Sequence, residues 1–459
     1  MLKKGQKIFF LIPPTKRHII RDYAGGLGFE LTEKVEEAYF LPPLDFLQLA
    51  ASVSDDFIVS VVDAEVENFS QQNILALLAT EKVDAIIIKI SFPTFESDLS
   101  FAKEIKTIVP LVIVKIETFN KEILTRILSE GKISFCIVTE CEDNLVDILL
   151  NGDKKGTAYL INDNLKVVFK DLIENLDTLP FPKRNFLKSK NYYYPKLGKC
   201  TTILSSRGCP YSCGYYCPYP LTQGEKWRSK SVDKVIAEIQ EILSSGIDTI
   251  LFRDAVFSFD VERAVAICDE IIAKRLDIKW WCETRADRLP DKLINKMVLA
   301  GCKGVNIGVE SGDSHLRHSH LKRGISDEKL QDICSNSKEA GLTVAFLLMV
   351  GYPGENRKSI LSTAKLLLNC RPDYIGINFP VAYPGTTLES DAIKNGWIKD
   401  AISFENFDGS KPLLETHNLS KSEMIESKQM LLNLFIKIKD GCQIEIQMAL
   451  LQISNWASK

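Results

Sequence analysis

The sequence has no basic excess and no long apolar run, and each absence narrows the range of functions. Its 57 lysines and arginines stand against 60 aspartates and glutamates, which gives a formal net charge of -3. No broad basic surface is therefore expected to follow a nucleic-acid backbone. No stretch approaches the ~18 uninterrupted apolar residues of a spanning helix, and the apolar run 8–12 is too short for a secretion signal. We expect neither a nucleic-acid ligand nor a membrane span.

The chain also lacks the cysteine pattern of a secreted disulfide framework. Most of its 12 cysteines stand singly within apolar patterns, which is typical of core thiols in a reducing cytoplasm. Only Cys209, Cys213 and Cys217 are clustered, in a turn-rich loop after a short apolar run. Thiolates suit iron-sulfur clusters or zinc, and three ligands leave one metal site open for chemistry. This loop is the predicted metal site.

The first ~150 residues alternate strand-like and helical patterns, which predicts a doubly wound parallel sheet. Strands are expected at 7–12, 58–62, 85–90, 111–115 and 135–138, and helices at 44–52, 73–78, 99–105 and 121–128. Ligands of such sheets bind beyond the carboxyl ends of the strands.

A hairpin within 152–169 and a proline-stiffened linker at 176–182 follow. The aromatic run Tyr192–Tyr194 is expected to pack on the second domain, with the lining of a ligand crevice as the alternative. A second alternation predicts strands at 201–204, 249–253, 279–283, 304–309, 343–349 and 374–379. Six strands with their helices indicate an open barrel, and the cysteine loop follows the first strand, at the carboxyl edge where active sites lie.

The C-terminal region is expected to be mainly helical. Ser420 and Glu423 have the spacing of a capping box, and Gly441 is placed to end that helix. The helix either covers the substrate or only packs on the barrel. We expect four parts, namely 1–150, 151–195, 196–399 and 400–459.

The cysteine loop resembles a known family. Arg207-Gly208-Cys209, Cys213, and Tyr216 before Cys217 are similar to the cluster loop of the radical S-adenosylmethionine (SAM) superfamily. Blocks at 252–254, 283–289, 308–312 and 351–355 resemble later motifs of that family. Blocks at 11–14, 41–44, 62–65, 139–142 and 176–182 resemble its cobalamin-binding, methyltransferase-like branch. The resemblance implies a cobalamin-binding-like Rossmann domain followed by an open (β/α)6 radical SAM partial barrel.

The resemblance also implies site residues. The three cysteines would hold a four-iron four-sulfur cluster whose fourth iron binds SAM, and reductive cleavage would give a 5'-deoxyadenosyl radical. The implied SAM-binding residues are Glu283, Arg285, Glu310 and Ser311 for its ribose and methionine parts, and Tyr216 and Gly351 near its adenine. Asp254 is included among them, with a satisfied strand end as the alternative for such polar residues.

Two departures from the family pattern bear on the cofactors. The cysteine spacing is C-x3-C-x3-C rather than C-x3-C-x2-C, an insertion that Gly214 can absorb, and a zinc site with Cys200 is the alternative. Lys115-Ile116 stands where relatives commonly carry Gly-Gly, and these bulkier side chains would hinder the close approach of cobalamin. Lys16 and Arg21 flank His18 where a D-x-H-x-x-G motif has its acid and last glycine, so no histidine ligand to cobalt is expected.

Three further histidines, His315, His318 and His320, lie close together. No carboxylate or cysteine shares a ligand spacing with them, so they are expected to be loop residues rather than metal ligands.

Three functions remain open. The first is cobalamin-dependent methylation of an unactivated carbon or phosphorus centre, and the second is a non-methylating radical reaction with a degenerate first domain. The third is a non-catalytic metal-binding scaffold. A cytoplasmic enzyme of this kind needs an electron donor, either a reductase or a flavodoxin-type protein. Its substrate, whether a small molecule, a lipid or a peptide, is not specified by the sequence.

Overall fold

The structure is a computed structural model. It describes the chain except residues 16–18, 22–38, 189, 212–214, 320, 322–323, 399–403 and 459. Contacts divide the chain into two compact units. The first unit comprises Met1–Pro210, Pro218–Ser231 and Ser403–Asp408, and the second comprises Tyr211–Cys217, Val232–Ile402 and Gly409–Lys459. The four-part division stays a prediction.

The first unit contains a seven-stranded sheet of order β2-β1-β3-β4-β5-β6-β7. Its strands are β1 (Lys7–Ile12), β2 (Ile58–Asp63), β3 (Ala85–Lys89), β4 (Leu111–Lys115), β5 (Phe135–Ile137), β6 (Thr157–Ile161) and β7 (Asn164–Val168). Strands β1 to β5 pair in parallel, as predicted. The predicted hairpin, β6 and β7, continues the sheet through an antiparallel pairing with β5. The strand order reverses between β1 and β3, the position at which such sheets commonly bind ligands.

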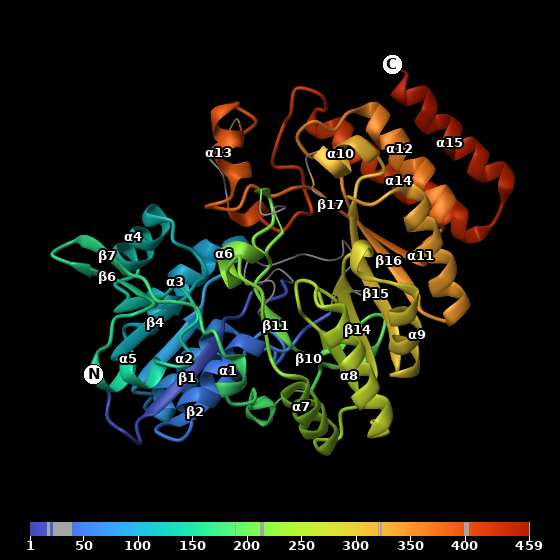
Figure 1. Cartoon of the computed structure of the whole chain (residues 1–459). Helices are drawn as coiled ribbons and strands as arrows, with labels where there is room; N and C mark the ends of the chain where they lie inside the picture. Colours follow the sequence, from blue (N-terminus) through green and yellow to red (C-terminus); the bar gives the residue numbers. More distant parts are fainter. Residues whose placement is uncertain are drawn as a thin grey trace. The chain divides into compact units, whose positions relative to one another are not determined.

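Helices cover both faces of this sheet (Figure 1). They are α1 (Leu44–Val53), α2 (Gln71–Glu81), α3 (Phe95–Ile105), α4 (Lys121–Glu130) and α5 (Leu145–Asn151). Helices α1 and α5 share one hydrophobic core with the inner residues of β1. Helix α3 begins four residues before its expected start at Leu99, because its polar first turn, Glu96–Asp98, carries no apolar periodicity.

The linker tyrosines pack within the first unit, which corrects the expectation that they pack on the second domain. The Tyr192 hydroxyl donates to Asp63 Oδ2 at 3.1 Å, and the rings of Tyr39 and Tyr194 meet edge to face at 5.3 Å. Asp63 is the last residue of β2 and is buried, so its carboxylate needs a hydrogen-bond donor. The sequence pattern does not reveal that Tyr192 is this donor. Burial raises the pKa of Asp63 to about 7.

The second unit contains five parallel strands in the order β13-β14-β15-β16-β17. They are β13 (Thr249–Phe252), β14 (Lys279–Thr284), β15 (Cys302–Glu310), β16 (Thr343–Met349) and β17 (Tyr374–Asn378). The remaining strand predicted for the barrel forms as β10 (Thr201–Ile203), and contacts assign it to the first unit. All six predicted strands are therefore present.

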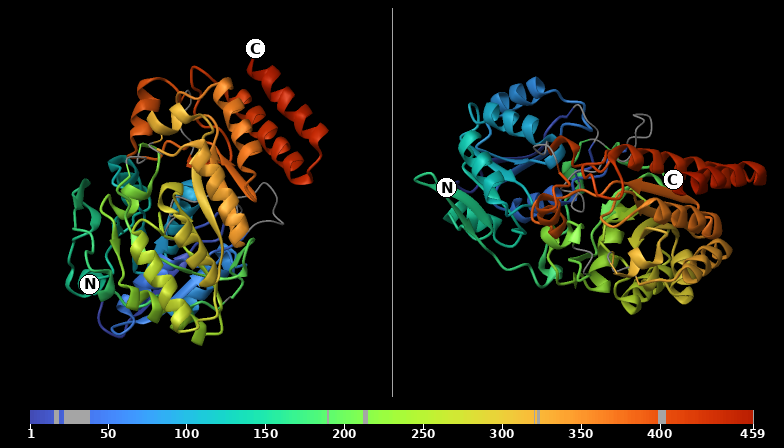
Figure 2. Two further views of the ribbon diagram at one scale, coloured as in Figure 1. Left: turned by 45° about the vertical axis from the view of Figure 1, so that its right-hand side comes forward. Right: turned by 90° about the horizontal axis from the view of Figure 1, so that it is seen from above.

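Helices of the second unit follow the strands in sequence. They are α7 (Val232–Ser244), α8 (Val261–Ala273), α9 (Asp291–Leu299), α10 (Ser314–Ser319), α11 (Asp327–Ala340), α12 (Arg357–Cys370), α13 (Thr387–Lys394), α14 (Lys421–Asp440) and α15 (Gln443–Ala457). Ser420 and Glu423 form the predicted capping box of α14, and Gly441 ends that helix with φ +78°. Helices α14 and α15 lie against each other (Figure 2).

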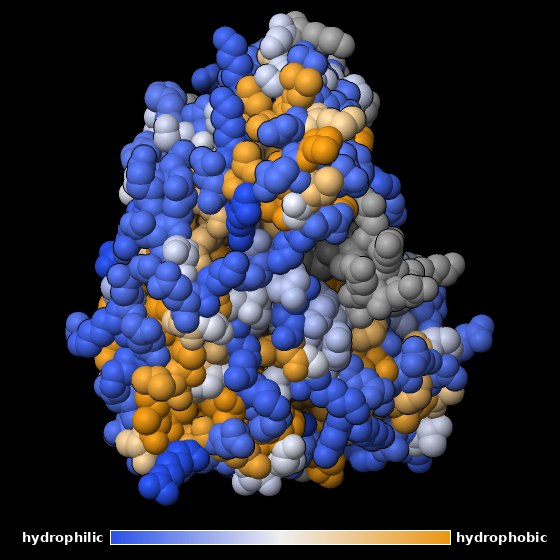
Figure 3. All heavy atoms as spheres, turned by 90° about the vertical axis from the view of Figure 1, so that its right-hand side faces the viewer, coloured by the Kyte–Doolittle hydropathy of each residue, from blue (hydrophilic) through white to orange (hydrophobic). Residues whose placement is uncertain are grey.

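On the face in Figure 3, hydrophobic residues gather in patches that hydrophilic residues surround. Among the described residues, no helix is long and apolar enough to cross a membrane.

Two buried ion pairs lie at the carboxyl ends of β3 and β4. Lys89 Nζ, which is fully buried, donates to Asp45 Oδ2 at 2.6 Å, and Lys115 Nζ donates to Glu117 Oε1 at 2.7 Å. Burial would raise the pKa of Glu117, but Lys115 and Lys89 hold that pKa at about 2. The buried charges at this edge of the sheet are thus stabilised by the opposite charges of their partners.

Removing one partner of the Lys89–Asp45 pair tests this dependence. Lys89→Met leaves the Asp45 carboxylate buried without its partner, and we expect the free energy of unfolding to fall by ~3–5 kcal/mol. Lys89→Met with Asp45→Leu should recover most of the loss. Chemical denaturation followed by circular dichroism measures both variants. Lys4→Met, which removes an exposed pair with Asp56, should change little, and a Lys89→Met variant as stable as this control would contradict the interpretation.

Candidate functional site

The cysteine loop begins at the end of the first strand of a short hairpin in the first unit. Its strands, β11 (Ser206–Arg207) and β12 (Arg228–Ser229), pair antiparallel. Between them α6 (Tyr219–Gln223) forms one helical turn. Gly208 has φ +84°, and a Cβ there would lie 2.1 Å from the Lys226 carbonyl oxygen, so only glycine fits. The Gly208 amide donates to Gln223 Oε1 at 3.2 Å. The backbone is therefore fixed directly before Cys209.

Cys209 itself is buried, and its amide donates to the Gly224 carbonyl at 3.0 Å. The Gly208 and Cys209 amides are thus tied to the last residue of α6 and to the residue after it. A ligand held on such a backbone has little freedom to move, which is what a metal centre requires.

Four buried charged side chains lie together at the hairpin, two from its own strands and two from the loop after β5. Arg228 donates through Nη1 and Nη2 to the Glu140 carboxylate at 2.7 and 2.9 Å. Arg207 Nη2 donates to Glu142 Oε1 at 2.8 Å, and its Nη1 lies 3.5 Å from Glu140 Oε1. Burial would raise the pKa of Glu140, but Arg207 and Arg228 hold it below its usual range. The Glu140 carboxylate is therefore held in its charged form by the two arginines.

The second part of the loop lies in the second unit, against residues that follow β14 and β16. The Arg285 guanidinium stacks on the Tyr211 ring at 3.8 Å, and Arg288 Nε donates to the Tyr211 hydroxyl at 2.9 Å. The Tyr216 ring meets the Tyr352 ring edge to face at 5.8 Å. Cys217 follows Tyr216 directly, so the third predicted ligand lies beside the carboxyl ends of these strands.

The middle of the loop holds the second predicted ligand and the expected bulge. Cys213 and Gly214 lie outside the described residues, and so does the expected bulge at Gly214. The set of three thiolate ligands therefore stays a prediction, as does their role in holding a cluster.

Strand β15 ends in an unusual backbone conformation. Glu310, its last residue, is buried and has φ +70°, in a region that bulky residues rarely adopt. The register of β15 against β16 shifts between Gly308 and Glu310. Backbone strain of this kind is commonly found at functional sites.

The turn after Glu310 is fixed by two contacts. The Ser311 carbonyl accepts a bond from Arg317 Nη1 at 3.0 Å, and the Gly312 amide donates to Thr363 Oγ1 at 2.8 Å. A Cβ on Gly312 would lie 2.2 Å from Thr363 Cα, so glycine is needed there. Glu310 and Ser311, both predicted SAM ligands, therefore stand on a rigid turn at the carboxyl edge.

The turn after β16 is built on Gly351 and Glu355. Gly351 has φ +91°, and its amide donates to Glu355 Oε2 at 2.6 Å. Met424 of α14 packs where a Gly351 side chain would be. Glu355 is 1% exposed, and burial raises its pKa to about 8. At neutral pH this carboxyl is therefore largely protonated.

The remaining predicted residues follow β13 and β14. Glu283 Oε1 accepts a bond from Arg253 Nη1 at 2.6 Å, and Asp254 is fully buried. Arg285 is held by Asp287 through bonds of 2.8 and 3.1 Å. Glu283 and Arg253 thus form an ion pair with each other in the structure.

Sequence reasoning missed several residues beside the loop, namely Tyr211, Arg288, Tyr352 and Asp391. The Tyr215 hydroxyl donates to Asp391 Oδ2 of α13 at 2.8 Å. Tyr352 stands in the Gly351 block and Tyr211 in the cysteine loop, so aromatic residues inside the two motifs were the available signal. Asp391 had no such signal, because it lies far along the chain.

No group of three or more histidine, cysteine or acidic residues in the described part of the chain is arranged to hold a metal ion. His315 and His318 lie on α10, a short helix rather than the expected loop, and His320 is outside the described residues. His318 Nδ1 lies 2.8 Å from the Ser314 carbonyl oxygen, a bond within the helix. Burial raises the pKa of Cys200 to about 12, so this thiol is neutral as it stands.

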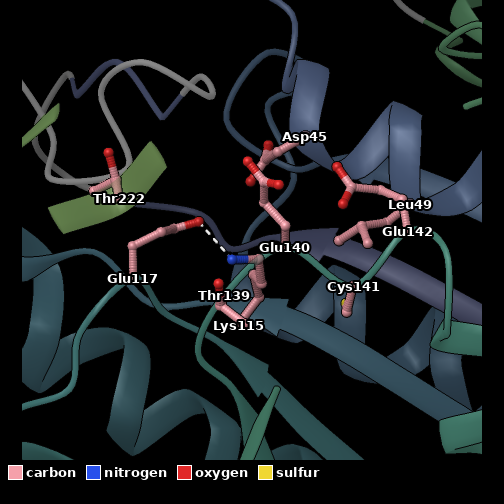
Figure 4. A pocket seen from close by; sticks show the side chains of 9 residues that line it. All are labelled: Asp45, Leu49, Lys115, Glu117, Thr139, Glu140, Cys141, Glu142 and Thr222. Carbon is pink, nitrogen blue, oxygen red and sulfur yellow. Dashed lines mark hydrogen bonds and ion pairs between the residues drawn. The ribbon is translucent and has the colours of Figure 1, made fainter. Parts of the chain in front are cut away.

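Two of the hollows at the carboxyl edge of the first sheet bear on cofactor binding. One is lined by Asp45, Lys115, Glu117, Glu140 and Glu142 among others, and Lys115 and Glu117 point toward each other in it (Figure 4). Its volume of about 10 Å³ admits about one water molecule.

The other hollow is a groove of about 750 Å³ beside the ends of β1 and β3. Such a volume is within the range of small-molecule sites. Its lining is rich in hydroxyl and amide groups, from Thr15, Ser70, Gln71, Gln72, Thr94, Ser97 and Ser100.

Part of the chain matches a known protein family. Residues 203–367 match the model of the Radical SAM superfamily. They form a radical SAM domain. This range holds the cysteine loop and the turns at Glu310 and Gly351, so the predicted family is confirmed.

Relatives extend the likeness beyond the radical SAM domain. An uncharacterized methyltransferase of Pyrococcus horikoshii is 28% identical over 413 residues, which cover 86% of this chain and 85% of the relative. The fold is also that of TsrM, a radical SAM methyltransferase of Kitasatospora setae solved with cobalamin and a [4Fe-4S] cluster bound. Its TM-score is 0.66 at 15% identity, with 85% of this chain and 75% of TsrM covered.

The cobalamin-dependent radical SAM enzyme OxsB, solved with aqua-cobalamin, matches with a TM-score of 0.65 at 16% identity. The match covers 93% of this chain and 61% of OxsB. The protein thus carries a radical SAM domain and has a relative named as a methyltransferase, and it shares its fold with these two enzymes.

The pKa of Glu355 predicts a pH dependence of stability. Its folded pKa lies above the usual value of 4.5, so the stability it contributes is complete below about pH 4.5 and is lost as pH rises toward about 8. Each pKa unit corresponds to about 1.4 kcal/mol. Glu355→Gln, a neutral isostere, should therefore become more stable than the wild type by up to a few kcal/mol as pH rises through this window, measured by unfolding of metal-free protein.

Glu389 supplies a matched control. It accepts a bond from the Gly385 amide at 2.8 Å with the same four-residue spacing, but in a more exposed turn. Glu389→Gln should follow the wild-type pH profile. A parallel profile for Glu355→Gln and wild type would show that Glu355 is ionised throughout.

Proposed function

We propose that this protein is a cobalamin-dependent radical SAM methyltransferase acting on an unactivated carbon or phosphorus centre. The observation that carries the proposal is the meeting of the cysteine loop with the strand ends in the second unit, where Tyr211 stacks under Arg285 and Tyr216 packs on Tyr352. This arrangement puts the residues around Cys217 beside the SAM-binding blocks implied by the family. The named relatives favour methyl transfer as the outcome.

The donor set fits an iron-sulfur cluster, because three cysteine thiolates in one loop are the ligands such clusters take. Cys209, Cys213 and Cys217 would hold it. When bound, the cluster supplies one electron that breaks a carbon-sulfur bond of SAM and leaves methionine and a 5'-deoxyadenosyl radical. A reductase or a flavodoxin-type protein of the reducing cytoplasm would deliver that electron.

The chain's own residues would bind and orient SAM. Glu310 and Ser311 offer polar groups on a rigid turn, Glu283 and Arg285 lie at the end of β14, and Gly351 leaves its turn free of a side chain. Rigid placement reduces the entropy lost when the reacting groups are brought together. Tyr216 would supply an aromatic surface near the adenine, and Asp254 a buried acid after β13.

The fit of cobalamin differs between the two hollows of the first unit. The hollow at the end of β4, where Lys115 and Glu117 pair, admits about one water and does not fit a large cofactor. The groove beside β1 and β3 does fit a bulky polar group, and its hydroxyl and amide side chains, among them Thr15, Ser70 and Ser97, would hold it. When bound, cobalamin supplies a transferable methyl group.

A second candidate function is a radical SAM reaction without methylation, such as a cyclisation, oxidation or rearrangement. The filled hollow at Lys115 favours it. The substrate of either reaction would be a small molecule, a lipid or a peptide.

Loss of one cluster ligand tests the enzyme against the metal-binding scaffold. Cys213→Ala should bind less iron and lose at least ~100-fold in 5'-deoxyadenosine formation from SAM under reducing conditions, since the group that activates SAM would be misplaced. Cys442→Ala, at an exposed cysteine, is the control and should match the wild type. A colourless, zinc-loaded wild type without SAM cleavage, sensitive to Cys200→Ala, would instead support the zinc scaffold.

Corrinoid content separates the two enzymatic candidates. Wild-type protein purified anaerobically with cobalamin supplied should retain corrinoid, and Ser97→Trp should lower its content about tenfold by filling the groove while leaving iron content unchanged. Ser129→Trp is the control, because Ser129 is an exposed helical serine outside the groove. Wild-type protein with full cluster occupancy and no corrinoid would rule out the methyltransferase.

A further inference from the structure

The loop that follows β5 holds the stem of the cysteine loop through charged side chains. Glu140 and Glu142 lie in the loop after β5. Arg207 and Arg228 belong to the two strands of the hairpin that carries Cys209. The partners lie 65 and 88 residues apart in sequence. A tertiary interaction within the first unit therefore anchors the first predicted cluster ligand.

Burial makes this anchoring strong and specific. The Arg228 and Glu140 side chains are each 2% exposed, and those of Arg207 and Glu142 are 4% and 3% exposed. A buried charge without a partner is costly, so each arginine is restricted to the position where its carboxylate lies. The two-point contact of Arg228 with Glu140 also fixes the plane of its guanidinium.

The same hairpin is tied to neighbouring backbone. Arg228 Nη1 donates to the Ile173 carbonyl and Nη2 to the Gln223 carbonyl, at 2.7 and 2.6 Å. Gln223 in turn accepts the Gly208 amide through its side chain. The contacts therefore form a continuous path from Glu140 through Arg228 and Gln223 to the residue before Cys209.

We propose that Glu140 and Glu142 are positioning residues for the iron-sulfur cluster: through Arg207 and Arg228 they set the placement of Cys209 and balance the charge beside it. The inference rests on the proposed function, because it requires that the cluster is bound. This role does not depend on cobalamin.

The charge balance predicts a property of the cluster itself. Two arginines and two glutamates give this set no net charge. Arg207 stands two residues before Cys209, so removal of the Glu142 charge leaves an uncompensated positive charge close to the ligand. Reduction adds an electron to the cluster, and nearby positive charge favours the reduced form. The reduction potential of the cluster should therefore rise in Glu142→Gln.

The experiment compares Glu142→Gln and Glu140→Gln with the wild type and with Glu96→Gln. Glu96 makes the same two-point contact with Arg126, at 2.7 and 2.6 Å, but is 55% exposed and lies in the same unit. Iron content, the electron paramagnetic resonance signal of the reduced cluster and its reduction potential are measured in reconstituted full-length protein. Thermal unfolding of the metal-free protein reports on folding separately.

We expect a raised reduction potential in Glu142→Gln, an altered resonance signal and lower iron content in Glu140→Gln, and wild-type values in Glu96→Gln. If the glutamine variants do not fold, Glu142→Asp, which keeps the charge but shortens the side chain, should still alter the resonance signal. Folded variants with wild-type potential, signal and iron content would overturn the inference alone. Wild-type protein that binds no cluster would overturn the proposed function and this inference with it.

Discussion

Compensation of buried charge is the constraint on which the first unit depends. Arg207 and Arg228 are buried beside the predicted cluster ligand, and a buried guanidinium is tolerated only with a partner. Glu140 and Glu142 supply that partner from the end of β5. The hairpin that presents Cys209 is thus held by a distant strand, and the same rule governs Lys89 with Asp45 and Lys115 with Glu117 at neighbouring strand ends.

In the second unit, backbone geometry rather than charge fixes the site. Glu310 and Gly351 both have positive φ at the ends of adjacent strands, and close approaches at Gly312 and Gly351 leave no space for a side chain. Tyr211 and Tyr216 connect the cysteine loop to residues after β14 and β16. A rigid edge with aromatic contacts is suited to holding a cosubstrate in one orientation.

Whether cobalamin fits the first unit depends on which hollow of the sheet edge it would occupy. Lys115 stands where the family resemblance implies a glycine, and its ion pair with Glu117 fills the edge near β4. The sheet nevertheless reverses its order between β1 and β3, and a groove remains there. A parallel sheet offers ligand space along its whole carboxyl edge, so one filled position changes where a cofactor fits rather than whether the fold can hold one.

The sequence by itself determined the strands of the two large sheets, the order of the motifs and the ends of α14, because apolar periodicity, capping residues and motif spacing are local properties. The family resemblance, which is carried by short motifs, also predicted site roles for Glu310 and Gly351. Only the tertiary structure decided which charges pair, because Glu140 and Arg228 are 88 residues apart and either could have been exposed. For the same reason Tyr192 was assigned to the wrong partner, and Asp391 was not found: a side chain's contacts depend on the packing of distant segments.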